Sequence, residues 1–136
     1  MNLKNKIKNK FSGLLPKTRS FFSQEYFTRA IAIWLIILSL AVNISEWVIL
    51  KMFVQPVDFP IILHYNVYFG VDMTGNYRSV FLIPAIGLAL FLVNMTLSIY
   101  FYRRKERIAS YLLLMTALMI QLSLLVATLS VVIINY

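Results

Sequence analysis

Residues 30–50 read AIAIWLIILSLAVNISEWVIL, and this stretch decides the class of the protein. A helix needs roughly 20 mostly apolar residues to cross a bilayer, and this run supplies them. Two more runs, 80–102 and 108–135, are as long and as apolar. The sequence therefore predicts an all-α integral membrane protein whose three transmembrane helices span about 29–53, 79–102 and 108–135.

The composition favours the same class. The chain is 60% hydrophobic and 13% charged, whereas soluble domains average about 45–50% apolar and about 25% charged residues. No segment outside the spans is long enough to bury a core of its own, so we expect a basic segment, 1–28, followed by one membrane domain, 29–136. The absence of cysteine excludes disulfides, thiolate metal sites and thiol catalysis.

The basic residues predict the orientation of the helices. Net charge is +8, and most of the Lys and Arg residues lie in the first 29 residues or in the 103–107 turn. Membrane proteins keep such residues on the cytoplasmic side. We therefore expect the N-terminus inside, the C-terminus outside, and residues 54–78 as an extracytoplasmic loop. The expected location is the plasma membrane.

The N-terminal segment has the pattern of a helix lying on a membrane surface. Apolar residues recur at helical spacing, with lysines on the other faces, and we expect anionic lipids rather than nucleic acid as the partner. A disordered basic tail is the alternative. A second aromatic piece is expected to continue into the first span near Arg29. The residues of the apolar stripe are Leu3, Ile7, Phe11 and Leu14, and those of the second piece are Phe21, Phe22, Tyr26 and Phe27.

The outer loop is too apolar for a free connection. From Leu63 to Phe69, apolar and polar residues alternate with the period of a strand. Gly70 and the Thr74-Gly75-Asn76 stretch then supply turns. We expect a structured cap at the outer ends of the helices, with its apolar face on the bundle or on lipid headgroups.

A resemblance appears at this loop. His64, Tyr65 and Asn66, followed by Gly70 and Asp72, resemble the outer loop of small bacterial multi-pass membrane proteins of unknown function. The pattern is also similar to the N-terminal domain of unknown function of bacterial toxin-immunity membrane proteins. The match covers only this loop, and it lacks the proline that usually stands just before the histidine. The resemblance implies a class of membrane protein and no mechanism.

Polar residues inside the spans are the second group of candidates. Ser39, Asn43 and Glu46 share one face of the first helix. Asn43, Asn94 and Gln121 are expected to form hydrogen bonds between helices. Glu46 has two readings: a proton or cation site formed with Asn43, or a carboxylate near the outer interface that pairs with Lys51 or bonds to the cap.

The loop candidates have two readings as well. His64, Asn66, Gly70 and Asp72 either hold the cap together or recognise a partner. A metal site at His64 would need further converging ligands, and no spacing indicates an activated nucleophile. We therefore expect no cofactor and no enzyme activity.

These observations favour a non-catalytic scaffold or accessory subunit of a membrane complex, bound to other membrane proteins or to itself. The alternative is an oligomeric ion or small-molecule transport unit that uses Glu46 and Asn43.

Overall fold

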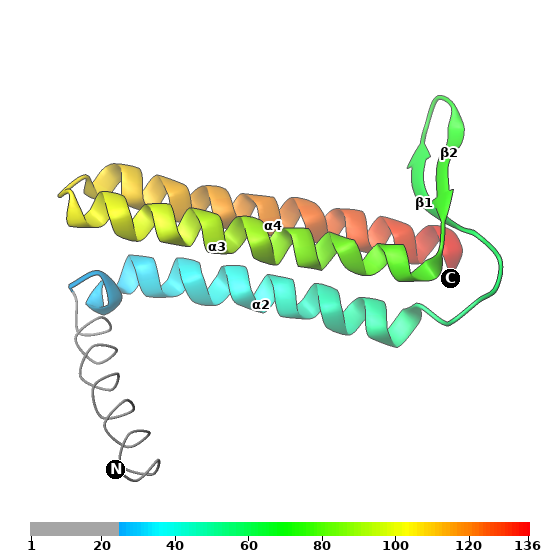
Figure 1. Cartoon of the computed structure of the whole chain (residues 1–136), viewed down its shortest axis with the longest axis horizontal. Coiled ribbons are helices and arrows are strands. Elements are labelled where there is room, and N and C mark those ends of the chain that lie inside the picture. The colour runs from blue at the N-terminus through cyan, green and yellow to red at the C-terminus, as the bar shows by residue number, and fades with distance from the viewer. Residues whose placement is uncertain (1–24) are drawn as a thin grey trace, which may run out of the picture.

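The structure is a computed structural model that describes residues 25–136 (Figure 1). Within this range lie the short 3₁₀ helices η1 (Glu25–Thr28) and η2 (Tyr77–Phe81), and the hairpin strands β1 (Ile61–Asn66) and β2 (Gly70–Gly75). The long helices are α2 (Ala30–Phe53), α3 (Leu82–Arg103) and α4 (Arg107–Asn135). The amphipathic stripe expected over residues 3–14 and the aromatic pair at 21 and 22 lie outside the described residues.

The three long helices form one bundle that confirms a multi-pass membrane protein. Each is long and apolar enough to cross a membrane, the second together with η2 as one run, Tyr77–Arg103. α2 and α4 run in the same direction and α3 runs in the opposite direction (Figure 1). The bundle therefore has two distinct ends, a basic end at the α3–α4 turn and a hairpin end beside the strands.

The bundle buries a set of polar side chains and leaves many large apolar side chains on its outer faces. The buried faces carry polar side chains from every long helix, while large apolar side chains lie on the outer faces. This pattern suits lipid, because apolar side chains need no shelter there whereas polar ones do. The buried polar residues are Ser39, Asn43, Glu46, Ser98, Ser110, Gln121 and Thr128.

At the basic end, the η1 residue Tyr26 closes the bundle. Its ring is buried with Ala32 and Leu114, and its hydroxyl lies 2.9 Å from Ser98 Oγ. Burial raises the pKa of the Tyr26 hydroxyl above its usual value, which keeps the phenol protonated. The backbone is extended at Arg29, between η1 and α2. The expectation that one helix runs continuously into the first span is therefore wrong for the described residues.

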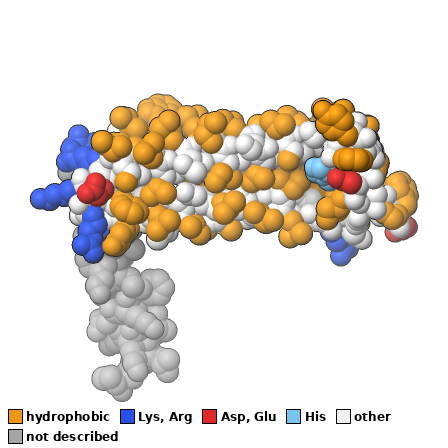
Figure 2. All heavy atoms as spheres, turned by 90° about the horizontal axis from the view of Figure 1, so that it is seen from above, with side chains coloured by type: hydrophobic (Ala, Val, Ile, Leu, Met, Phe, Trp, Pro, Cys, Tyr) orange, Lys and Arg blue, Asp and Glu red, His pale blue; other side chains and the backbone are white. Residues whose placement is uncertain are grey.

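The connection between α3 and α4 is short and basic. Lys105 adopts the left-handed conformation (φ 67°), and its N–H donates to the carbonyl of Tyr102. The next N–H, of Glu106, donates to the carbonyl of Phe101. These bonds end α3 and reverse the chain. Figure 2 shows Lys and Arg side chains gathered at this end of the molecule.

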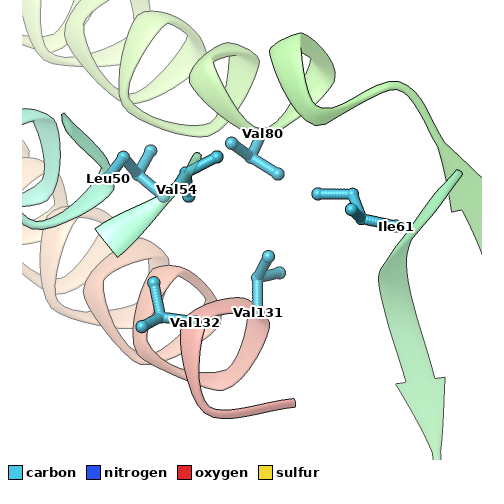
Figure 3. Packing of buried hydrophobic residues seen from close by; sticks show 6 residues of the cluster. All are labelled: Leu50, Val54, Ile61, Val80, Val131 and Val132. Atoms are coloured by element: carbon cyan, nitrogen blue, oxygen red, sulfur yellow. The ribbon is translucent and has the colours of Figure 1, made fainter. Parts of the chain in front are cut away.

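At the hairpin end, an apolar cluster joins the strands to the helices. Val80, from η2, and Ile61, the first residue of β1, pack against the ends of α2 and α4 (Figure 3). The loop expected as a cap is therefore structured and continuous with the core. The members of the cluster are Leu50, Val54, Ile61, Val80, Val131 and Val132.

The strands pair antiparallel, with an irregular register. Ile62 lies opposite Thr74 and His64 opposite Met73, which leaves Leu63 as an extra residue in β1. The next pair skips Asp72 in β2. Two such bulges in a short hairpin break the simple alternation. The expectation of one apolar face from Leu63 to Phe69 is therefore wrong beyond the first residues, because β1 ends at Asn66.

Candidate functional site

The middle of the bundle holds a cluster of amide side chains that joins all three helices. Asn43 Nδ2 donates to the carbonyl of Pro84 at 2.9 Å and to Gln121 Oε1 at 3.3 Å. Gln121 Nε2 in turn donates to the carbonyl of Gly87 at 2.9 Å. Asn43 and Gln121 are buried. The sequence predicted bonds between helices for these two amides, and the structure brings them into contact.

Gly87 makes this close approach possible. A Cβ atom built on it would lie 2.8 Å from Leu124 Cδ1 and 2.9 Å from Gln121 Oε1. Real Cβ atoms do not approach other atoms so closely, so a larger residue would force the side chains of Leu124 and Gln121 to shift. The glycine thus gives the Gln121 amide room to reach the carbonyl of Gly87.

Glu46 lies one helical turn from Asn43 on the same buried face, toward the hairpin end. Its side chain is 0% exposed, and neither carboxyl oxygen has a hydrogen-bond partner among residues 25–136. The hydroxyl of Thr128, in α4, is also buried without a partner in this described part of the chain. Because α2 and α4 run in the same direction from the Asn43–Gln121 contact, both unpartnered groups lie on the hairpin side of the amide cluster.

Two expectations about these residues are wrong. Glu46 neither pairs with Lys51 nor bonds to the cap, because its oxygens have no partner and Lys51 is exposed on another face of α2. Asn94 does not join two helices, since its Nδ2 donates to the carbonyl of Leu90 in its own helix at 2.9 Å. An asparagine in a helix can donate a hydrogen bond to the backbone carbonyl four residues earlier, and sequence spacing does not reveal this choice.

The four loop candidates all lie in the two strands of the hairpin. His64 Nδ1 lies 2.7 Å from Asp72 Oδ1, with side chains 64% and 42% exposed. Asn66 Oδ1 accepts the N–H of Tyr68 at 2.9 Å and so fixes the turn. Gly70 has φ 77°, the left-handed region. Within residues 25–136, no group of three potential metal-ligating side chains forms around this pair.

The tip of the hairpin is apolar and open. Val67, Tyr68 and Phe69 are 84%, 90% and 85% exposed. Turns usually carry small polar residues, so three consecutive large apolar or aromatic residues at a tip are unusual. Figure 1 shows the hairpin standing crosswise to the helices, with this tip away from the bundle.

Asn135 ties the hairpin to α4, a role that the sequence did not indicate. Its Oδ1 accepts the N–H of Ile62 at 2.8 Å, and its Nδ2 donates to the carbonyl of the same residue at 2.7 Å. The side chain thus occupies the free edge of β1 as a neighbouring strand would. An asparagine at the end of an apolar helix was the available signal, but its partner lies 73 residues away in the sequence.

Comparison of the whole chain with protein-family models, with curated proteins and with solved structures finds no match, so the candidate site stands on its geometry.

Proposed function

We propose that the protein is a non-catalytic scaffold or accessory subunit that binds another membrane protein through its hairpin tip. The observation that carries this proposal is the exposed run Val67-Tyr68-Phe69. Aromatic side chains in an exposed position are typical anchors of protein interfaces. The partner is another membrane protein or a second copy of the chain.

The way the hairpin is held supports the proposal. The amide of Asn135 and the apolar cluster around Ile61 fix β1 to the bundle. The tip, in contrast, is not buried by any other part of the described chain. The His64–Asp72 pair braces the two strands. A rigid base with an open apolar tip loses little conformational entropy on binding, which favours recognition.

The proposed setting is the bacterial inner membrane, with the basic end in the cytoplasm and the hairpin outside. The basic residues at the α3–α4 turn support this orientation through the positive-inside rule. The loop resemblance to small bacterial membrane proteins agrees with the setting. In this orientation the hairpin meets extracytoplasmic parts of its neighbours.

The test uses a photo-crosslinking amino acid at Tyr68 in native membranes, with the same amino acid at Met52 as the control. Met52 is also strongly exposed and apolar but lies on α2. The proposal expects a protein adduct from position 68 and none of the same mass from 52. The double variant Tyr68→Ser/Phe69→Ser should keep the melting temperature and lose co-purification of that protein. Adducts with lipid alone at position 68 would contradict it.

A second candidate, an ion or small-molecule transport unit, is favoured by Glu46. A buried carboxyl group without a partner inside a membrane bundle is costly, and such residues often mark a pathway. Against an oligomeric pore, Glu46 faces the interior of its own bundle and is not on a surface that a second copy could reach. Ion flux in proteoliposomes, compared between the wild-type protein and Glu46→Gln, separates the two functions.

A further inference from the structure

A groove lies between α2 and α3 near the basic end of the bundle. Its volume is about 590 Å³, within the usual range of ligand pockets. Ile33, Ile36 and Ile37 line it from α2, Met95, Ile99 and Tyr100 from α3, and Phe27 lies at its η1 side. The groove exists because α2 packs mainly on α4 and only loosely on α3.

The groove is apolar on both sides along its length and positively charged at one end. Among the described lining residues, nearly all side chains are hydrocarbon or aromatic, and Arg103 is the charged exception. Arg103 stands in the last turn of α3, where that helix reaches the basic turn. The guanidinium of Arg104 lies 5.4 Å from the ring centre of Tyr100, so a second positive charge stands close to the same end.

The length of the groove matches one leaflet of a bilayer. From Met95 to Arg103 the helix rises about 12 Å, and half of a typical hydrocarbon core is about 15 Å. Tyr100, near the charged end, is a residue type that favours the headgroup level. An acyl chain lying between Met95 and Tyr100 would therefore place its headgroup beside Arg103.

We propose that this groove binds one anionic phospholipid, with an acyl chain between α2 and α3 and its phosphate group at Arg103. The chemistry of both ends supports this occupant. The apolar walls exclude a soluble polar ligand, whereas a basic pocket between transmembrane helices suits an anionic headgroup. The inference requires only that the three helices span a membrane, so it is independent of the function proposed for the hairpin.

The experiment reconstitutes the full chain in vesicles of equimolar phosphatidylglycerol and phosphatidylcholine, extracts it gently, and records native mass spectra. The wild-type protein should retain one phosphatidylglycerol in preference to phosphatidylcholine. Arg103→Gln should reduce that preference about fivefold, because one surface Lys or Arg contributes about 1 kcal/mol toward an anionic lipid. Lys105→Gln removes a charge from the same turn but does not line the groove, and should leave the preference unchanged.

A second pair of variants tests the apolar part. Ile37→Trp places a bulky ring in the groove and should abolish lipid retention, while Ile44→Trp, two turns further along α2, should retain it. Both positions are about half exposed, so neither change is made in the core. Equal melting temperatures would show that both variants fold. If Ile37→Trp does not fold, Arg103→Gln still tests the lipid site independently.

Three results would overturn the inference. One is a wild-type protein that retains no lipid, as expected if another part of the chain fills the groove. Another is retention of both lipids without preference, or equal effects of Arg103→Gln and Lys105→Gln. The third is a lipid-free dimer that Ile37→Trp dissociates, which would identify a second copy as the occupant.

Discussion

Replacing Glu46 with leucine should make the protein more stable. The Glu46 side chain is fully buried, and both carboxyl oxygens lack a hydrogen-bond partner within the part of the chain that the structure describes. Most residues in a packed bundle destabilise it when they are changed, so a gain in stability would be an unusual result. A gain in stability is expected here because burial of the Glu46 carboxyl group destabilises the wild-type fold.

The magnitude comes from the cost of burying a polar group without a partner. Mutational data place this cost at about 1–3 kcal/mol per group, and leucine is similar to glutamate in size. Glu46→Leu should therefore raise the free energy of unfolding by about 1–3 kcal/mol. Glu46→Gln keeps a polar group without a partner in the same place and should recover little of that energy.

Asn43→Leu is the matched control, because it removes a polar side chain one turn away on the same face. Asn43 makes two bonds to other helices, to Pro84 and Gln121, at 2.9 and 3.3 Å. Such bonds average about 0.6 kcal/mol each in membrane bundles, so this variant should lose about 1 kcal/mol. The two leucine variants should thus shift stability in opposite directions.

The assay is equilibrium unfolding of the purified chain in mixed micelles, as the fraction of SDS is increased, followed by circular dichroism. A midpoint for Glu46→Leu at or below that of the wild-type protein would refute the reasoning. It would mean that the carboxyl group has a partner or that leucine cannot fill its place. The same measurement on Glu46→Met would then distinguish these two explanations.

Three more outcomes follow from the fold. Asn135→Leu should cost about 1–3 kcal/mol for the two lost bonds to Ile62 and speed amide hydrogen exchange at Ile62, whereas Asn135→Asp, which can still accept the Ile62 N–H, should show a smaller effect. Gly70→Val should lower the melting temperature, because φ 77° costs a side chain with Cβ about 1–2 kcal/mol, while Gly70→Asn should be milder; equal melting curves would contradict the strain. A single cysteine at Lys105 should be protected from an impermeant thiol reagent in intact cells and one at Thr74 should be labelled; the reverse pattern would invert the proposed orientation.

The three spans could be predicted from the sequence because their signal is local. Twenty or more consecutive apolar residues determine a bilayer-spanning helix with no need of knowledge of its neighbours. The buried face of α2 could also be predicted, since Ser39, Asn43 and Glu46 fall at helical spacing. The side chains that these residues contact could not be predicted, because they depend on which helices pack together.

The hairpin shows where sequence reasoning failed. Alternation from Leu63 to Phe69 indicates a strand, but two bulges shift the faces, and β1 ends at Asn66, where the turn begins. A bulge is decided by cross-strand pairing and carries no reliable local signal. The tie from Asn135 to Ile62 is a long-range contact and was missed for the same reason. The groove beside Arg103 depends on how loosely α2 and α3 pack, which no residue spacing encodes.

The Asn135 tie also has a consequence for biosynthesis. Because the chain is made from its N-terminus, the two strands emerge well before the residue that fixes them, which follows 73 positions after Ile62. At ordinary translation speeds this gap is about 4–15 s. During that interval the N–H and carbonyl of Ile62 face outward on an unpaired strand edge, which can pair with any other extended chain nearby. Completion of α4 therefore closes an aggregation-prone edge, and a chain truncated before Asn135 would keep that edge open.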